Sequence, residues 1–261
     1  MKNRTLLFGE GLFETFRVYQ GRRLAFVDDH LARMADGCRF FSLPFSREDA
    51  ERALECALPE IPSDTEARLR LNLVSYGNQR VEKTAFHTAW EPLQKMDTWQ
   101  KEGVKLGLAP FQKFSRSPIV RFKTTSYLEN IFVFSRAREQ GLFDALFLNE
   151  RGEITEGSIS NVFFLSEDAI LTPPVDAGLL PGITRKQMME VIRGLGRSVV
   201  ERAITLADLE RFNGLFVTNA VIEILPVRTV NDTRYEIPEL VDALRNAYRQ
   251  RAEASLFSRD L

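Results

Sequence analysis

The first half of the chain alternates between strand-like and helix-like spacing of its apolar residues. Residues 13–30 predict two strands joined by a turn at 20–21. The apolar residues that follow recur at helical spacing, so we expect a helix that begins near Asp28 or Asp29, either of which could cap it. A second amphipathic helix is predicted over 47–58.

Apolar and polar residues then alternate over 69–74, which is typical of a strand with one buried face. In the second half, the spacing predicts helices over 125–141, 182–196 and 237–255. Short apolar runs between them read as strands, with a hairpin turn at 151–152. Because strands and helices mix without a regular βαβ rhythm, the expected fold class is α+β rather than a doubly wound parallel sheet.

Composition narrows the class of protein. The 261 residues are 44% hydrophobic and 27% charged, as in ordinary soluble proteins with a sizeable core. The net charge of −1 offers no broad basic field, so neither nucleic acid nor membrane is an expected partner. No stretch approaches the roughly 20 apolar residues of a membrane helix. Cys38 and Cys56 form no disulfide framework, which favours a reducing cytoplasm.

The sequence gives little support for a metal site or for a dinucleotide-binding site. The histidines, His30 and His87, belong to no cluster of metal-ligating residues, so no metal site is predicted. Gly9 and Gly11 lack the third glycine of a dinucleotide-binding fingerprint, and they are interpreted as a turn.

Lys123 lies between an extended segment and a predicted helix, next to Phe122 and two threonines. Apolar neighbours disfavour the ammonium form of a lysine and make its amine a better nucleophile. The alternative is an ordinary surface lysine before a helix, and this feature alone favours that alternative.

Gly182, Ile183 and Thr184 stand at the start of a predicted helix. Free N–H groups and the helix dipole make such a start suitable for an anion, and glycine allows close approach to the backbone. The alternative is a plain Pro-Gly turn with Thr184 as the helix cap.

Glu156 lies where a polar segment gives way to an apolar run. A carboxylate beside a heteroaromatic nitrogen holds that nitrogen protonated, whereas a carboxylate at a strand end is often only solvated. A nucleophilic amine, an anion site and a partner for a pyridine nitrogen are together what pyridoxal 5'-phosphate requires.

Six segments in one order carry a resemblance to a known family. The chain resembles the class IV aminotransferases, which are fold-type IV pyridoxal-phosphate enzymes. The segments are "FGEGLFETFRVYQG", "HLARM", "KTTSYLEN", "ALFLNERGEITEGSISNVFF", "TPPVDAGLLPGITR" and "FVTNAVIEILPV". The resemblance implies a two-domain α+β fold, with a small N-terminal α+β domain and a larger C-terminal α/β-barrel-like domain.

The resemblance also implies a role for each matching residue. Lys123 would be the Schiff-base lysine and catalytic base, Glu156 the partner of the pyridine nitrogen, and Arg33 a phosphate ligand. The other cofactor-binding positions implied by the motifs are Ile183, Thr184, Thr218, Asn219, Ser160 and Asn161, with Tyr127 close to the site.

The resemblance leaves two reactions open, because one site of this kind supports both transamination and elimination. Residues 216–227 look most like aminodeoxychorismate lyase, which releases pyruvate and 4-aminobenzoate for folate synthesis. The alternative is an aminotransferase acting on D-amino or branched-chain amino acids with 2-oxoglutarate. A non-catalytic relative is less favoured, since both Lys123 and Glu156 are present.

The family is homodimeric, so the resemblance implies a homodimer that acts on a small amino-group substrate. It also implies domains over 1–110 and 119–261, and the aperiodic stretch 111–118 is the expected linker.

The family's usual Arg-Gly pair after the first long strand is replaced here by Tyr76-Gly77, so the substrate contacts of that loop cannot be carried over. Arg17, Arg68 and Arg70 are candidates to bind a substrate carboxylate, with exposed strand arginines as the alternative.

Overall fold

The computed structural model describes residues 1–257, which group by their contacts into two compact units. Unit 1 comprises residues 1–94, 122–127 and the end of the chain from 252, and unit 2 comprises 95–121 and 128–251. The stretch 111–118, expected as a linker, lies within unit 2, where the Lys113 backbone N–H donates to the Leu148 carbonyl (2.8 Å). The domain limits inferred from the sequence stay a prediction.

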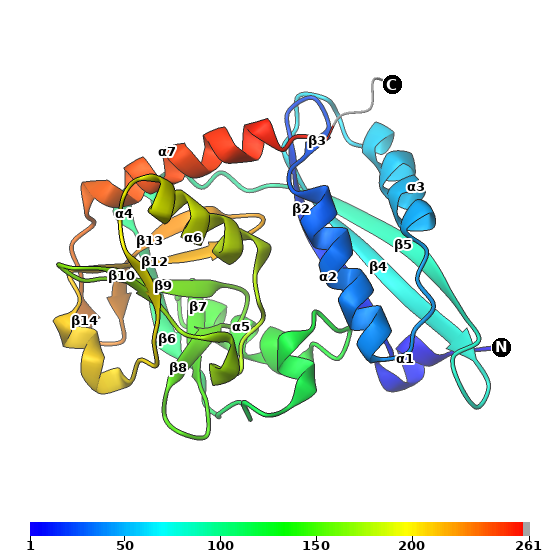
Figure 1. The fold of residues 1–261 in the computed structure, drawn as a ribbon, viewed down its shortest axis with the longest axis horizontal. Helices are drawn as coiled ribbons and strands as arrows, with labels where there is room; N and C mark the ends of the chain where they lie inside the picture. The colour runs from blue at the N-terminus through cyan, green and yellow to red at the C-terminus, as the bar shows by residue number, and fades with distance from the viewer. Residues whose placement is uncertain (258–261) are drawn as a thin grey trace. The chain divides into compact units, whose positions relative to one another are not determined.

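Unit 1 is built on a five-stranded antiparallel sheet. Its strands are β1 (Lys2–Asn3), β2 (Gly11–Tyr19), β3 (Arg23–Leu24), β4 (Ala67–Gly77) and β5 (Lys83–Pro92). Its helices are α1 (Arg4–Phe8), α2 (Val27–Phe40), α3 (Arg47–Ala57) and the 3-10 turn η1 (Leu58–Glu60). Helices α2 and α3 pack against the strands of this sheet (Figure 1).

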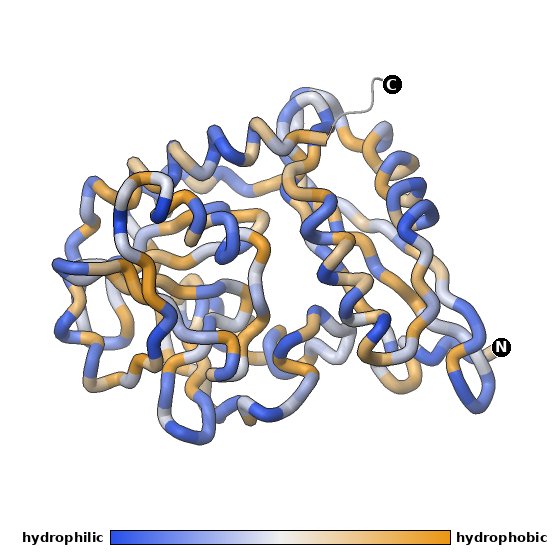
Figure 2. The backbone as a smooth tube through the Cα atoms, in the orientation of Figure 1, coloured by the Kyte–Doolittle hydropathy of each residue, from blue (hydrophilic) through white to orange (hydrophobic). Residues whose placement is uncertain are grey.

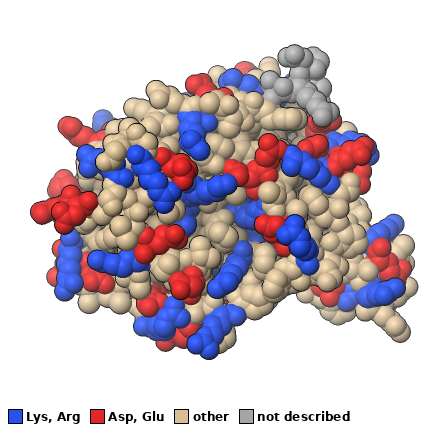
Figure 3. All heavy atoms as spheres, in the orientation of Figure 1, with Lys and Arg blue, Asp and Glu red and all other residues tan. Residues whose placement is uncertain are grey.

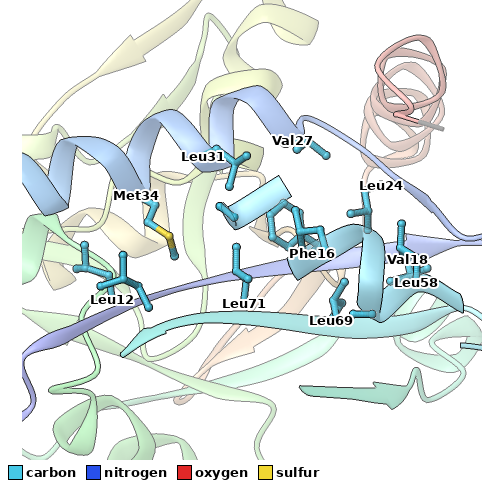
Figure 4. Packing of buried hydrophobic residues seen from close by; sticks show 14 of the residues in the cluster. Leu12, Phe16, Val18, Leu24, Val27, Leu31, Met34, Leu58, Leu69 and Leu71 are labelled. Carbon is cyan, nitrogen blue, oxygen red and sulfur yellow. The ribbon is translucent and has the colours of Figure 1, made fainter. Parts of the chain in front are cut away.

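The alternation predicted for 69–74 is confirmed in β4. Leu69, Leu71 and Leu73 are fully buried, while the residues between them are partly exposed. The leucines join Phe16 of β2 and Met34 of α2 in one apolar cluster (Figure 4). Burial of apolar area on this scale stabilises unit 1 and fixes which face of β2 and β4 looks toward α2.

The predicted cap of α2 is wrong. The helix begins at Val27, one residue before Asp28, and the preceding Phe26 adopts a left-handed backbone conformation (φ 56°). Asp28 and Asp29 therefore lie inside the first turn, where their charges favour the positive end of the helix dipole. Asp28 forms an ion pair with Arg47 of α3.

Unit 2 contains a nine-stranded mixed sheet. Its strands are β6 (Val104–Leu108), β7 (Asp144–Leu148), β8 (Ile154–Gly157), β9 (Asn161–Leu165), β10 (Ile170–Thr172), β11 (Val199–Glu201), β12 (Gly214–Asn219), β13 (Glu223–Val230) and β14 (Thr233–Arg234). Its helices are α4 (Asp97–Glu102), α5 (Leu128–Glu139), α6 (Ile183–Gly194) and most of α7 (Glu239–Ala254), with 3-10 turns η2 (Pro118–Arg121), η3 (Val175–Ala177) and η4 (Leu206–Arg211).

The central strands of unit 2 are apolar along their whole length, in contrast to β4. Every residue of β9 and nearly every residue of β12 is buried, and Figure 2 shows apolar residues along these strands. Helix α6 packs against β12, α4 against β13 and α5 against β7. Phe163 of β9 stacks on Phe216 of β12 with ring centroids 4.8 Å apart, so the core continues across neighbouring strands.

The α+β class is confirmed, as are the helices expected near 47–58, 182–196 and 237–255. Strand β5 and helix α4 were not predicted. Residues of β5 are exposed or partly exposed throughout, so it lacks the alternation that marks β4. Helix α4 spans only six residues, which is too short to show a helical period.

Positive and negative side chains are interspersed on the face of the molecule drawn in Figure 3. This mixture agrees with the net charge of −1 and the absence of a single-sign field in the composition. Within residues 1–257, no helix has both the length and the apolar content needed to cross a membrane.

Candidate active site

Unit 1 holds Lys123 at the edge of β2. The Lys123 carbonyl accepts from the Phe13 N–H (2.9 Å), and the Thr125 N–H donates to the Gly11 carbonyl (2.9 Å), so this segment runs antiparallel beside β2. The Lys123 amine lies 4.5 Å from the Phe13 ring centroid and 5.5 Å from that of Tyr127. The predicted apolar walls are therefore present, and Lys123 is half-buried rather than a fully exposed surface lysine.

Arg33 lines the same small pocket as Lys123, together with Glu14 and Phe13. Glu14 lies on the buried face of β2 and accepts from Arg33 Nε (2.9 Å) and Nη2 (2.6 Å). Nδ1 of His30 lies 2.7 Å from the same carboxylate. Two residues of α2, three positions apart, thus meet one carboxylate of β2.

Opposing effects set the protonation of this group. Burial alone would raise the pKa of Glu14, but the charge of Arg33 and the hydrogen bond from His30 lower it to about 2. The pKa of His30 is lowered, chiefly by burial, and the positive charges of Arg33 and Lys123 act in the same direction. Glu14 is therefore an anion at neutral pH that fixes the Arg33 guanidinium.

Sequence reasoning missed Glu14 and His30 as members of this group. A signal was present, because Glu14 stands between Leu12 and Phe16 at the core-facing positions of β2. A carboxylate on the apolar face of a strand needs a buried cation, and Arg33 with His30 supplies it.

The three candidate arginines of the sheet differ in their partners. Arg17 pairs with Glu66 (2.7 Å) and Arg68 with Glu91 (2.9 Å). Arg70 forms no ion pair with a carboxylate among the described residues; its Nε donates to Asn72 Oδ1 (2.8 Å). Its guanidinium carbon lies 3.5 Å from the Phe13 ring centroid, and burial lowers its pKa. Arg70 and the Lys123 amine thus both contact the Phe13 ring.

Unit 2 holds Glu156 in β8, where its side chain is 7% exposed. Oε1 accepts from the Lys113 amine (2.8 Å), and Oε2 accepts from the Leu180 N–H (3.1 Å) and from Asn161 Nδ2 at the long distance of 3.4 Å. Glu156 is therefore aimed into the protein, not solvated at a strand end. Sequence reasoning missed Lys113, which lies 43 positions earlier in the chain.

Asn161 links Glu156 to the segment that enters α6. Its Nδ2 also donates to the Leu180 carbonyl (3.0 Å). A Cβ on Gly182 would lie 2.0 Å from Asn161 Oδ1, so only glycine permits this close approach.

The start of α6 differs from the capped turn offered as the alternative. Gly182 is the cap residue and forms no side-chain cap, while Ile183 and Thr184 lie inside the first turn. Thr184 is buried, with its hydroxyl 3.5 Å from the Tyr248 hydroxyl, at the limit of a hydrogen bond. The first turn of this 12-residue helix thus carries N–H groups that a side chain does not cap.

Thr218 and Asn219 end β12 beside Asn161. Thr218 is paired across the sheet with Asn161, so the two side chains share a face. The buried Thr218 hydroxyl has no hydrogen-bond partner among residues 1–257. Asn219 is used locally: its Oδ1 accepts from the backbone N–H groups of Val221 and Ile222, and its Nδ2 donates to the Ile159 carbonyl.

Ser160 faces away from Glu156 toward another buried carboxylate. Its hydroxyl donates to Asp144 Oδ2 (2.7 Å), and Asp144 Oδ1 accepts from the N–H groups of Ser158 (2.9 Å) and Ala145 (2.8 Å). Burial raises the pKa of Asp144, while these hydrogen bonds oppose the rise. Asp144 thereby shapes the 157–160 turn between β8 and β9, and sequence reasoning missed it.

The predicted site residues fall into two sets. Lys123 and Arg33 share a pocket in unit 1, and Glu156 is joined through Asn161 to the start of α6 in unit 2. The remaining members of the second set are Ser160, Ile183, Thr184, Thr218 and Asn219. The chemistry of these groups suits pyridoxal phosphate, since a buried carboxylate, an uncapped helix start and a lone buried hydroxyl in unit 2 match a cationic ring nitrogen and a phosphate.

Fold and site together define a two-unit α+β protein with buried ionic groups suited to an anionic, nitrogen-containing cofactor. The family model for amino-transferase class IV matches residues 11–230, which is most of the chain. The chain belongs to this family, whose members are pyridoxal-phosphate-dependent transaminases or lyases.

Named relatives include both kinds of enzyme. The chain is 28% identical to a D-alanine aminotransferase of Bacillus licheniformis, over 88% of this chain and 82% of the relative. It is equally 28% identical to an aminodeoxychorismate lyase of Bacillus subtilis, over 94% of this chain and 86% of the relative. A hypothetical aminotransferase of Mycobacterium tuberculosis, solved in a PLP-bound form, shares 25% identity with a TM-score of 0.84, covering 97% of this chain and 92% of that one.

Proposed function

We propose that this chain is a pyridoxal-phosphate enzyme whose reaction is the release of pyruvate and 4-aminobenzoate from aminodeoxychorismate. The observation that carries the cofactor proposal is the buried Glu156 carboxylate, held beside the uncapped start of α6 and the lone hydroxyl of Thr218. A cationic ring nitrogen of the cofactor would pair with the Glu156 carboxylate. Its phosphate would accept hydrogen bonds from the first turn of α6 and from the Thr218 hydroxyl.

The residues then take these roles. Lys123 would hold the cofactor covalently through its amine, and the Phe13 and Tyr127 rings would keep that amine in apolar surroundings. The family motifs assign phosphate binding to Arg33, which Glu14 fixes, and also to Ile183 and Thr184 in the first turn of α6. These roles rest on the family motifs and on the local surroundings of each side chain.

When bound, pyridoxal phosphate supplies an electron sink that accepts the electrons of a broken bond at the substrate's Cα. Glu156 would keep the ring nitrogen protonated, since its buried carboxylate is paired with Lys113 on one oxygen only. Lys123 would act as a general base that takes the proton from the carbon bearing the substrate amine. The C–O bond to the enolpyruvyl group would then break, and the released enolpyruvate would take up a proton to become pyruvate, leaving 4-aminobenzoate.

One feature supports the lyase over transfer of the amino group. The turn after Thr218 and Asn219 resembles the lyase subfamily, and Asn219 Oδ1 accepts two hydrogen bonds within that turn, from the N–H groups of Val221 and Ile222. Folate synthesis is the pathway this reaction would serve.

A paired assay on protein loaded with pyridoxal phosphate tests the proposal. One arm supplies aminodeoxychorismate and follows 4-aminobenzoate and pyruvate. The other supplies D- and L-amino acids with 2-oxoglutarate and follows the keto acids formed. We expect fast release of 4-aminobenzoate with little amino transfer, and the reverse result would overturn the lyase proposal.

An aminotransferase is the second candidate function. The observation that favours it is the match to a D-alanine aminotransferase at the same 28% identity. Both reactions need Lys123 as the base and Glu156 as the ring partner, so Lys123→Ala tests them together. We expect turnover of this variant to fall by at least about 10³-fold. The visible absorbance of the lysine-bound cofactor should also be lost. Retained activity would remove Lys123 from the mechanism.

Arg70 is the arginine we propose as the ligand of a substrate carboxylate. Arg17 and Arg68 are already paired with Glu66 and Glu91, whereas Arg70 is half-buried and forms no such pair within residues 1–257. Its stacking on Phe13 brings the guanidinium next to the ring that contacts Lys123. The carboxylate of a substrate would form the ion pair with Arg70.

We also propose a homodimer in the cytoplasm. Helix α5 exposes Leu128 (80%), Ile131 (46%) and Phe132 (44%), an apolar group that a second copy of the chain would cover. Free Cys38 and Cys56 suit a reducing compartment. Sedimentation of the purified protein at several concentrations tests the dimer, and a monomer throughout would exclude it.

A further inference from the structure

We propose that Lys113 is a positioning residue that pairs with the Glu156 carboxylate and orients it toward the cofactor's ring nitrogen. This role rests on the function proposed above. Lys113 is only 6% exposed, and its amine lies 2.8 Å from Glu156 Oε1. A lysine is rarely so buried unless it is paired, so the two side chains depend on each other.

The backbone holds Lys113 in place independently of this ion pair. Its N–H donates to the Leu148 carbonyl (2.8 Å), and it forms a parallel bridge with Asn149 at the end of β7. The amine also lies 4.2 Å from the Phe147 ring centroid, where an ammonium is attracted to the aromatic face. The segment that carries Lys113 is therefore anchored to the end of β7, the strand paired with β8, by contacts other than the ion pair itself.

The contacts of Glu156 are unequal on its two oxygens. Oε1 takes the charge-assisted bond from Lys113, whereas Oε2 takes only the Leu180 N–H and a long contact from Asn161. A carboxylate has about four acceptor positions, so it keeps the capacity for another cationic donor. Lys113 thus compensates the buried charge without saturating the group.

Other charged side chains nearby are committed elsewhere. Asp144 accepts from Ser158 and Ser160, and Arg185 on α6 donates to Glu201 and to the Pro173 carbonyl. Among the described residues, Lys113 is the cation in contact with Glu156. A carboxylate buried without a cation tends to take up a proton, and a neutral carboxyl group cannot hold a ring nitrogen in its cationic form.

Lys113 is not expected to replace Lys123 as the covalent lysine. The ring nitrogen and the aldehyde carbon of pyridoxal phosphate stand at opposite ring positions. A lysine bonded to the partner of the nitrogen therefore lies at the wrong end for the aldehyde. Reduction of the loaded protein with borohydride, followed by peptide mapping, reports which lysine is modified. Modification of Lys113 would overturn the proposal.

A double-mutant cycle on cofactor affinity tests the coupling. Apo protein is titrated with pyridoxal phosphate for the wild type, Lys113→Met, Glu156→Gln and the double variant. We expect Lys113→Met to weaken binding about tenfold alone but less than about twofold in the Glu156→Gln background. Equal losses in both backgrounds would show a merely structural role. Lys113→Gln serves as a second variant if Lys113→Met does not fold.

A spectroscopic reading separates charge from packing. The pH at which the visible absorbance of the lysine-bound cofactor changes should rise in Lys113→Met, because the cofactor's ring nitrogen would lose the proton, and with it the positive charge, that Glu156 is proposed to hold there. Lys113→Arg should return it toward the wild-type value, and Lys105→Met, an exposed lysine of β6, should leave it unchanged. An unshifted midpoint in Lys113→Met would overturn the role. Wild-type protein that binds no cofactor would overturn the proposed function together with it.

Discussion

Two buried carboxylates, one in each unit, are held in different ways. Glu14 receives two hydrogen bonds from Arg33 and lies 2.7 Å from Nδ1 of His30, so both of its oxygens meet strong partners. Glu156 meets one cation, Lys113, on one oxygen, and its other oxygen has only amide contacts. Both groups are almost fully removed from solvent.

This difference separates a structural anion from one that can still receive a ligand. Saturation by strong partners fixes Glu14 as part of the framework that orients Arg33. Glu156 has fewer strong hydrogen-bond donors, so its carboxylate can still accept a hydrogen bond from a cationic group of the cofactor. Replacement of Glu14 should therefore reduce mainly the free energy of unfolding, and replacement of Glu156 mainly turnover.

The largest effect is expected for Glu156→Gln. The amide keeps the size of the side chain but cannot hold a ring nitrogen protonated, so turnover of the loaded enzyme should fall about 10³-fold. Steady-state kinetics at saturating cofactor measure the loss, with the exposed Glu167→Gln of the same unit as the control. Turnover within a few-fold of wild type would place Glu156 with Glu14 as a structural anion.

The sequence predicts a site residue when its neighbours in the chain form a motif, but not when its partner is far away in the chain. Glu156 and Lys123 stand in motifs whose neighbours identify them, and the strand of 69–74 follows from alternation. Lys113 is 43 positions from Glu156, and nothing local in 111–118 marks its partner. Such an ion pair forms only when the chain folds, so the sequence alone does not reveal it.

The arginines of the first sheet show the same limit. Arg17, Arg68 and Arg70 are alike in sequence, each on the polar face of a strand. They differ because Glu66 pairs with Arg17 and Glu91 pairs with Arg68 after folding.

The start of α2 was also predicted wrongly. An aspartate was expected to cap the helix, but the helix begins one residue earlier, after the left-handed backbone of Phe26.

The next effect concerns stability and Glu14. Its pKa is lowered from 4.5 to about 2, so its ionised form stabilises the fold fully above the unfolded value and this contribution is lost as pH falls from about 4.5 toward 2. A shift of this size corresponds to about 3 kcal/mol. Glu14→Gln should lower the free energy of unfolding at pH 7 by a similar amount, because the Arg33 guanidinium loses the carboxylate that its Nε and Nη2 bind.

Urea unfolding between pH 7 and pH 3 measures both parts of this prediction. The wild type should lose stability in the acid part of that range, and Glu14→Gln should lose less of it. Glu48→Gln, an exposed acid on α3, provides the control. Identical pH dependence in wild type and Glu14→Gln would mean that Glu14 is not the anion that holds Arg33 in unit 1.

A smaller effect is expected for Arg70→Gln. If Arg70 binds a substrate carboxylate, KM should rise about tenfold, while the free energy of unfolding changes by less than about 1 kcal/mol, since no ion pair with a described residue is broken. Arg68→Gln, from the neighbouring exposed pair with Glu91, is the matched control and should leave KM unchanged. An equal rise of KM in both variants would indicate a general charge effect.

The smallest effect tests a third buried carboxylate against the other two. Asp144 is surrounded by hydroxyl and backbone donors, and burial raises its pKa. Its neutral form is therefore favoured on folding, so this group adds stability at low pH that is lost as pH rises through its folded value. Asp144→Asn removes the charge but turns an amide toward the Ser160 hydroxyl, and we expect a loss of about 1 kcal/mol at pH 7 that grows as the pH is lowered. Urea unfolding at pH 7 and pH 5 measures it. A loss as large as that of Glu14→Gln would mean that Asp144 is held as an anion, and that hydrogen bonds alone can do what Arg33 and His30 do for Glu14.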